Sequence, residues 1–259
     1  GALLKRPGNA DSWVPDRRPV LSRAEARDVY DGFARKGHHT AGRDAQSGYG
    51  GPAVKALLEM AAFDEVESVV DFGCGQAKLA ELILNMHDKM TWLGFDQSSE
   101  MLERAQSRLT PFGDRVKLVL VADGNPAAAL ASVPAASVDR FVSTYCLDLM
   151  SDADMFAVID DAERCLRPET GVMLLAGITW GYRLSLFTFL TTAVWEVLYR
   201  CTRKVVGGCR PQHLEPYLLH RGWRITKKVV TLPDGYPWMA SEVIAARPPD
   251  GASCLKKTQ

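Results

Sequence analysis

Apolar residues follow two different spacings along the central part of this chain. Short apolar runs, typical of buried strands, lie at 69–72, 91–95, 116–121, 138–143 and 171–178. Stretches with apolar residues at helical spacing separate these runs, at 76–86, 98–109 and 151–166. This alternation predicts parallel strands whose helical connections cover both faces of a sheet. Two later runs, 223–231 and 241–246, complete an expected α/β fold: a doubly wound, mostly parallel sheet of seven strands, the last one antiparallel.

The segments before and after this core have other patterns. Residues 1–20 contain five Pro or Gly residues and little periodicity, so we expect a flexible lead-in there and a flexible tail over 249–259. Ser22 and Glu25 have the spacing of a capping box, which predicts a helix from Ser22 to about Lys36. A glycine-rich stretch and a second helix follow. We therefore expect one domain over 21–248, with a helical lid over 21–62.

Residues 179–221 interrupt the alternation and predict a helical insertion on the substrate side. The stretch 184–199 has too many large apolar groups for an ordinary solvated helix, among them Phe187, Phe189, Leu190, Trp195 and Tyr199. They indicate core packing, a wall for a lipophilic substrate, or a membrane-surface face. The membrane interpretation is the weaker one, because basic residues flank this stretch without interleaving. Arg210-Pro211 predicts the start of a further helix that Gly222 ends.

Composition and charge narrow the classes of function. Lys+Arg and Asp+Glu both total 31, so the balanced charge argues against nucleic acid as a partner. The apolar stretch 184–199 is shorter than the roughly 20 residues of a membrane-spanning helix, so we expect no such segment, while peripheral membrane contact stays open. The six cysteines lack metal-ligand spacing, so we expect no metal site. Reduced thiols indicate a cytoplasmic protein.

A glycine-rich turn after the first strand is the strongest chemical signal. In Asp71-Phe-Gly73-Cys74-Gly75-Gln-Ala77 a strand stops at Gly-x-Gly, which lets a ligand lie against the backbone at a helix N-terminus. Dinucleotide-binding loops need a further glycine where Lys78 stands. The pattern Asp71-x-Gly73-x-Gly75-x-Ala77 instead resembles the first motif of class I methyltransferases, which bind S-adenosyl-L-methionine.

Acidic residues close the next two strands. Asp96 lies 21 positions after Gly75, and a carboxylate there can accept hydrogen bonds from both hydroxyls of a ribose, in either cofactor class. Asp123-Gly124 closes the third strand, and the resemblance implies that an acid there accepts the adenine amino group. Ligands of open α/β sheets bind at the carboxyl ends of the strands, where these residues gather.

Two further segments extend the resemblance, which covers about residues 66–178. The turn 166–171 (LRPETG) resembles the LRPGG turn of the same superfamily. The segment 29–34 (VYDGFA) is similar to the start of ubiquinone/menaquinone C-methyltransferases and phospholipid N-methyltransferases, in which it folds over the cofactor. The resemblance thus implies a lid that contains Tyr30.

These arguments assign candidate residues to three roles. The cofactor candidates are Asp71, Gly73, Cys74, Gly75, Asp96, Gln97, Met101, Asp123, Gly124, Thr144 and Tyr49. The substrate candidates are Tyr30, Phe187, Trp195 and Arg210, and the candidates for a general base are Tyr145, Asp148 and His38.

The expected function is in-line transfer of a methyl group from S-adenosyl-L-methionine to an N, O, S or C atom of a small, partly apolar acceptor. Two alternatives stay open. An NAD(P)-dependent oxidoreductase is disfavoured by Lys78 and by the lack of a downstream Tyr-x-x-x-Lys pair. A non-catalytic methyltransferase-like protein is disfavoured because all three strand-end acids are present.

Overall fold

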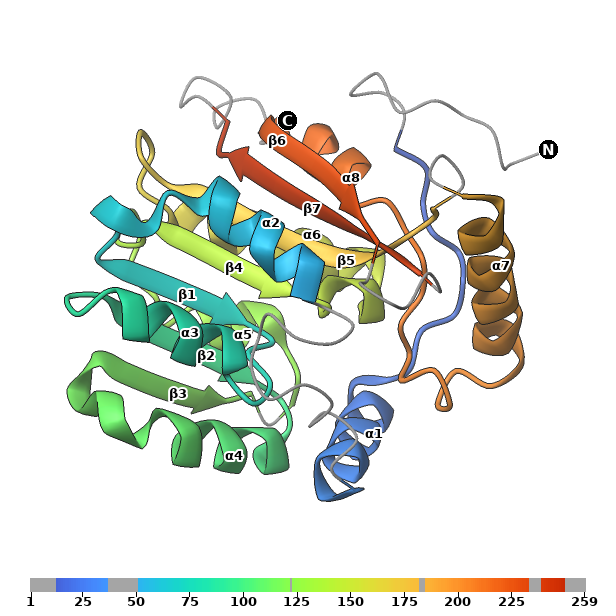
Figure 1. Ribbon diagram of the computed structural model, residues 1–259, viewed down its shortest axis with the longest axis horizontal. Coiled ribbons are helices and arrows are strands. Elements are labelled where there is room, and N and C mark those ends of the chain that lie inside the picture. Colours follow the sequence, from blue (N-terminus) through green and yellow to red (C-terminus); the bar gives the residue numbers. More distant parts are fainter. Residues whose placement is uncertain (1–12, 37–50, 122, 182–184, 233–238, 250–259) are drawn as a thin grey trace.

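The computed structural model describes residues 13–36, 51–121, 123–181, 185–232 and 239–249. Seven strands form one sheet in the order β3-β2-β1-β4-β5-β7-β6 (Figure 1). Their bounds are β1 Ser68–Phe72, β2 Thr91–Asp96, β3 Val116–Leu120, β4 Arg140–Thr144, β5 Val172–Thr179, β6 Arg224–Thr231 and β7 Ala240–Arg247. β1 to β5 are parallel, while β7 is antiparallel to both β5 and β6. The expected seven-stranded α/β sheet is therefore found, as a mixed sheet.

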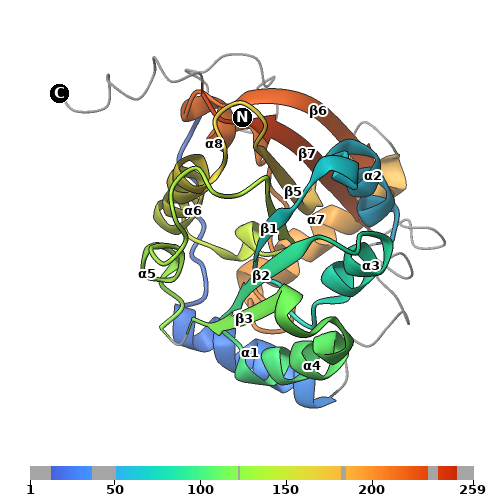
Figure 2. The ribbon, with the colours of Figure 1, turned by 90° about the vertical axis from the view of Figure 1, so that its left-hand side faces the viewer.

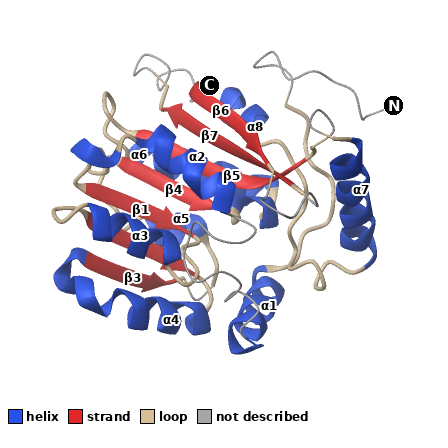
Figure 3. Ribbon diagram, in the orientation of Figure 1, coloured by secondary structure: helices blue, strands red, loops and turns tan. Residues whose placement is uncertain are grey.

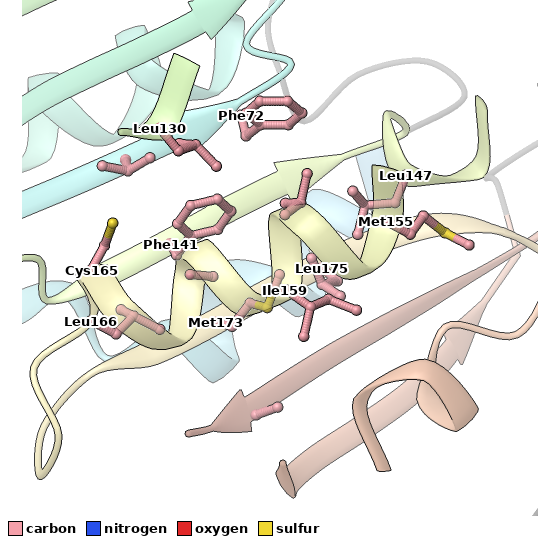
Figure 4. Close-up of a cluster of buried hydrophobic side chains, with 14 of the residues drawn as sticks. Phe72, Leu130, Phe141, Leu147, Met155, Ile159, Cys165, Leu166, Met173 and Leu175 are labelled. Atoms are coloured by element: carbon pink, nitrogen blue, oxygen red, sulfur yellow. The ribbon is translucent and has the colours of Figure 1, made fainter. Parts of the chain in front are cut away.

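Helices cover both faces of this sheet (Figure 2). One face carries α2 (Gly51–Ala61), α3 (Lys78–Met86) and α4 (Ser99–Leu109), and the other carries α5 (Pro126–Leu130), α6 (Asp152–Cys165) and α8 (Glu215–His220). Neighbouring strand residues point to opposite faces, so Phe141 and Met173 pack in the cluster around α6 (Figure 4). Val142 and Leu174 pack in the cluster on the opposite face.

Polar caps begin the helices where the sequence predicts them. The Ser98 hydroxyl accepts a hydrogen bond from the Met101 N–H at 3.1 Å, and the Ser151 hydroxyl accepts one from the Asp154 N–H at 3.2 Å. Ser22 and Glu25 form the predicted capping box at the start of α1 (Arg23–Lys36), with N–H···O distances of 3.0 and 3.2 Å. α5 is a short helix that the sequence analysis did not anticipate.

Two helices, α1 and α7 (Leu186–Cys201), lie beyond the carboxyl ends of the parallel strands (Figure 3). α1 packs against α4. α2, the second helix of the segment 21–62 expected to form a lid, packs on β5, β6 and β7, where Ala53 and Leu57 are buried.

Residues 13–20 are packed, in place of the flexible lead-in expected over 1–20, of which 1–12 lie outside the described residues. The Trp13 ring lies 5.0 Å from the Phe156 ring, and Arg18 forms an ion pair of 2.6 Å with Glu196 of α7. These contacts bind the segment to α6 and α7.

The helix predicted from Arg210 begins later, at Glu215. The Arg210 N–H donates to the Asp148 carbonyl at 3.3 Å, and the Gln212 N–H donates to the Ile178 carbonyl at 3.0 Å. These bonds hold residues 210–212 beside the turn that follows β4 and beside the end of β5, before the helix begins.

Candidate active site

A cavity of about 700 Å³ lies at the carboxyl ends of the parallel strands. Its volume falls in the range of about 300–1,000 Å³ that is usual for small-molecule sites. One side is formed by the residues that follow β1, β2 and β4, and the other by α1, α7 and the segment 205–209. The cavity therefore joins a polar strand-end side to a largely apolar side.

Two glycines shape the floor of the strand-end side. Gly73 and Gly75 have φ values of 81° and 53°, in the left-handed region that favours glycine. A Cβ at Gly73 would lie 2.5 Å from the Cys146 Sγ, so a side chain cannot be accommodated there. At Gly75 a Cβ would meet no atom within 4 Å, so the backbone faces open space in which a ligand can lie.

The Asp71 carboxylate faces this space without a complete set of partners. Asp71 lines the cavity, is 2 % exposed, and its Oδ1 atom has no hydrogen-bond partner. Burial, together with the charge of Asp96, raises the pKa of Asp71 to about 7. Buried polar atoms are nearly always paired, so this oxygen fits a donor group brought by a ligand.

The Asp96 carboxylate is held in a fixed position. Its Oδ2 atom accepts the Gly75 N–H at 2.8 Å, and its Oδ1 atom accepts the Ser98 N–H at 2.9 Å. Burial raises the pKa of Asp96, and the backbone N–H groups partly offset that effect. Each oxygen keeps a further lone pair, so Asp96 can accept two hydroxyl groups of a ligand that lies over Gly75.

Of the other cofactor candidates, most line the cavity and one does not. Cys74, Gln97, Met101, Gly124 and Thr144 are lining residues. Asp123 is exposed and does not line the cavity. Its carboxylate accepts the Asn125 N–H at 2.9 Å, a hydrogen bond within the same loop. Tyr49 lies outside the described residues.

The three candidate bases have different positions. Tyr145 lines the cavity, and its hydroxyl lies 2.7 Å from the Ser241 hydroxyl. Asp148 is fully buried and is not among the residues that line the cavity; burial raises its pKa to about 6. His38 lies outside the described residues.

The substrate candidates divide in the same way. Tyr30 and Trp195 line the apolar side, and the Trp195 indole N–H donates to the Cys209 carbonyl at 3.0 Å. Phe187 lies on the outer side of α7 and is 50 % exposed.

Arg210 is a structural residue, contrary to the expectation. Its side chain is 1 % exposed and forms an ion pair of 2.9 Å with Asp16. Its guanidinium also donates to the carbonyl groups of Asp148 and Met150, at 3.1 and 2.6 Å. Arg210 is not among the residues that line the cavity.

Several lining residues were missed by the sequence analysis. They come from loops and from α1: Leu21, Arg23, Leu149, Met150, Val205, Val206 and Met239. Arg23 forms an ion pair of 2.6 Å with Asp154 at this side of the cavity. No local pattern marks such residues, because only the tertiary structure brings them together.

Comparisons with known proteins agree with this geometry. Residues 69–169 match the sequence family described as "Methyltransferase domain". A comparison with curated protein sequences finds no match. The match therefore covers the glycine turn and both strand-end acids, Asp96 and Asp123.

Solved structures share the fold at low sequence identity. The [4+2]-cyclase SpnF is 17 % identical, with a TM-score of 0.64 over 90 % of this chain and 99 % of that one. A SAM-dependent methyltransferase from Anabaena variabilis is 14 % identical, with a TM-score of 0.62 over 91 % and 99 %.

An O-methyltransferase family protein from Burkholderia thailandensis is 16 % identical, with a TM-score of 0.60. The similarity covers 88 % of this chain and 61 % of that one, so the chain spans about three fifths of that protein's length. Residues 69–169 thus match a methyltransferase domain family, and the solved structures share the fold around them.

Proposed function

We propose that this protein transfers a methyl group from S-adenosyl-L-methionine to a small, largely apolar acceptor. The observation that carries the proposal is the unpaired Oδ1 atom of Asp71, beside the open backbone at Gly75 and the fixed carboxylate of Asp96. Asp71 would accept the amino group of the cofactor and Asp96 its ribose hydroxyls. When bound, the cofactor supplies a methyl group that its sulfonium already activates for displacement.

The apolar side of the cavity supports an acceptor with hydrocarbon character. Its walls are Tyr30, Phe33, Ile178, Trp195, Val206 and Met239. Such walls exclude water and fix the acceptor by shape. Proximity and alignment of two bound reactants can contribute about 7–11 kcal/mol to lowering a reaction barrier, so in-line transfer makes modest demands on side-chain chemistry.

Four buried ionisable groups of the cavity are phenols and thiols that stay protonated. Burial raises the pKa values of Tyr30, Tyr145, Cys146 and Cys209 above their ordinary values. Among the described residues, these groups can donate hydrogen bonds but cannot take up a proton at neutral pH. We therefore propose an acceptor that presents a lone pair without proton transfer to these four groups. His38 remains a candidate base.

The fold by itself does not decide the reaction, since SpnF is named as a [4+2]-cyclase and shares it. The test must therefore measure both binding and product. Isothermal titration with S-adenosyl-L-methionine and with NAD separates the cofactor classes. Screening lipophilic amines, phenols and thiols for S-adenosylhomocysteine formation tests transfer.

We expect binding of S-adenosyl-L-methionine alone, weakened by about 1.5–3 kcal/mol in Asp96→Ala, which loses charge-assisted hydrogen bonds. Tight NAD binding with no response to S-adenosyl-L-methionine would overturn the cofactor assignment. Cofactor binding without S-adenosylhomocysteine from any acceptor would overturn the transfer.

A further inference from the structure

Helix α7 has an inverted distribution of polar and apolar side chains. The outer face of α7 is exposed to solvent and consists of Leu186 (73 % exposed), Phe187 (50 %), Leu190 (54 %), Val194 (61 %), Val197 (58 %) and Leu198 (40 %). Its buried residues are Thr188, Thr192, Glu196 and Tyr199. A surface helix normally buries its apolar side, so the outer face needs an explanation.

Polar contacts fix the rotation of α7 about its axis. Glu196 is bound between Arg18 at 2.6 Å and Arg200 at 2.7 Å. The Tyr199 hydroxyl donates to the Pro19 carbonyl at 2.6 Å. These bonds hold the polar side of the helix against residues 13–20, which run beside α7 in Figure 1. The helix cannot turn its apolar side inward without breaking them.

The α7 outer face leads to the cavity. Val205, just after the helix, is 69 % exposed and also lines the cavity, as does Trp195 of α7. An apolar surface therefore extends from solvent to the side of the cavity proposed for the acceptor.

The charges at this surface are basic. The only acid of α7 is Glu196, which is buried in its two ion pairs. The Arg200 and Lys204 side chains, 65 % and 62 % exposed, lie at the end of the helix, where Arg200 pairs with Glu196 at 2.7 Å and Lys204 with Glu25 at 3.2 Å. Arg203 between them gives this end a basic excess of three cations over two acids. Apolar groups next to exposed basic groups complement an anionic lipid surface.

The α7 outer face is too small to hold a second copy of this chain by itself. A helix of 16 residues is about 24 Å long and about 10 Å wide, so one face offers a few hundred Å². A stable protein–protein interface buries about 800 Å² on each partner. Within the described residues, no helix is long and apolar enough to cross a membrane. Contact with the surface of a bilayer fits both observations.

We propose that α7 lies in the plane of an anionic lipid membrane, with its outer face in the boundary between headgroups and acyl chains. A lipophilic acceptor would then pass from the bilayer along Val205 and Trp195 into the cavity. This passage rests on the proposed function, whereas the membrane contact does not.

Flotation of the full chain with phosphatidylcholine vesicles, with and without phosphatidylserine, tests the contact. We expect binding that is about tenfold stronger with phosphatidylserine and falls as salt rises. Val194→Glu and Leu190→Glu each place a charge on the outer face and should reduce binding roughly tenfold or more. Met86→Glu is the matched control, because Met86 is 52 % exposed on α3 and should leave binding unchanged.

Titration of each variant with S-adenosyl-L-methionine, without vesicles, keeps the two proposals separate, since α7 variants should retain cofactor affinity. Absence of vesicle binding by the unsubstituted chain would overturn the membrane contact. Light scattering that shows a dimer, converted to a monomer by Val194→Glu, would also overturn it and assign the face to a second copy. Equal loss of vesicle binding in Met86→Glu would overturn the role of α7.

Discussion

The two sides of the cavity are built in different ways. The strand-end side is positioned by main chain: Gly73 and Gly75 turn between β1 and α3, and the Gly75 N–H holds Asp96. The opposite side is positioned by side chains far apart in the sequence, such as Arg18 with Glu196 and Asp16 with Arg210. The strand-end side is therefore built from neighbouring residues and should be insensitive to substitutions elsewhere in the chain. The opposite side depends on a few ion pairs between distant residues.

The largest change in stability is expected from Asp16→Ala, which removes an ion-pair partner on the side of the cavity opposite the strand ends. Asp16 accepts from both Arg18 and Arg210, whose charges outweigh burial and hold the pKa of Asp16 well below its ordinary value. Removing this carboxylate leaves the Arg210 cation enclosed without its partner. We expect a loss of about 3–5 kcal/mol in the free energy of unfolding, measured by urea denaturation.

Asp28→Ala is the matched control, because Asp28 is 76 % exposed and its substitution should change stability by less than about 0.5 kcal/mol. Since ionised Asp16 stabilises the fold, its contribution is present above the ordinary carboxyl pKa of about 4 and falls as the pH drops below it. A loss under about 1 kcal/mol in Asp16→Ala would contradict the view that ion pairs hold this side together.

The difference between the two sides explains what could be predicted from the sequence. The positions of Gly73, Gly75 and Asp96 at the cavity follow from spacing within some 25 residues, because a strand, a tight turn and a helix constrain each other locally. The seven strands followed from apolar runs for the same reason. In contrast, Arg210 was expected to contact substrate, and its partner Asp16 lies 194 positions away, so no local pattern could show the pair.

Turn chemistry accounts for the strand-end candidate that the structure does not bring into the cavity. β3 ends at Leu120, and the carboxylate of Asp123 accepts a backbone N–H two residues later. Asp followed by Gly favours such turns, so the resemblance alone could not distinguish a ligand contact from a local one. The apolar character of 184–199 was evident, but which side of α7 faces solvent is decided by Glu196 and Tyr199.

The next largest effect, a loss of cofactor affinity, is expected from Asp71→Asn on the strand-end side. The amide keeps the shape but loses the charge, so affinity for S-adenosyl-L-methionine should fall by about 1.5–3 kcal/mol, roughly 10- to 150-fold, in isothermal titration.

The raised pKa of Asp71 means that its ionisation destabilises the unliganded fold as the pH rises from about 4 to about 7. The variant should therefore unfold at a higher temperature than the unsubstituted protein above pH 7, and a lower one would contradict the burial of an ionised carboxylate.

A smaller effect is expected from pH alone. With a pKa of about 7, the ionised fraction of Asp71 rises about tenfold between pH 6 and pH 8. Only the ionised carboxylate attracts a cationic amino group fully, so affinity for S-adenosyl-L-methionine should rise by up to about tenfold over this range. In Asp71→Asn the rise should disappear; if it persists there, Asp96 is the titrating group.

The smallest change in cofactor affinity is expected from Asp123→Ala, which tests whether the loop after β3 belongs to the cofactor site. The resemblance implies an adenine contact for this acid, whereas the structure exposes it and engages its carboxylate with the Asn125 N–H. An exposed loop acid of this kind should change cofactor affinity by less than about 0.5 kcal/mol, within the range of surface substitutions. Titration of Asp123→Ala beside Asp96→Ala measures both under the same conditions. A loss in Asp123→Ala as large as that in Asp96→Ala would mean that the loop after β3 rearranges when the cofactor binds, and the main chain would then position only two of the three strand ends in advance.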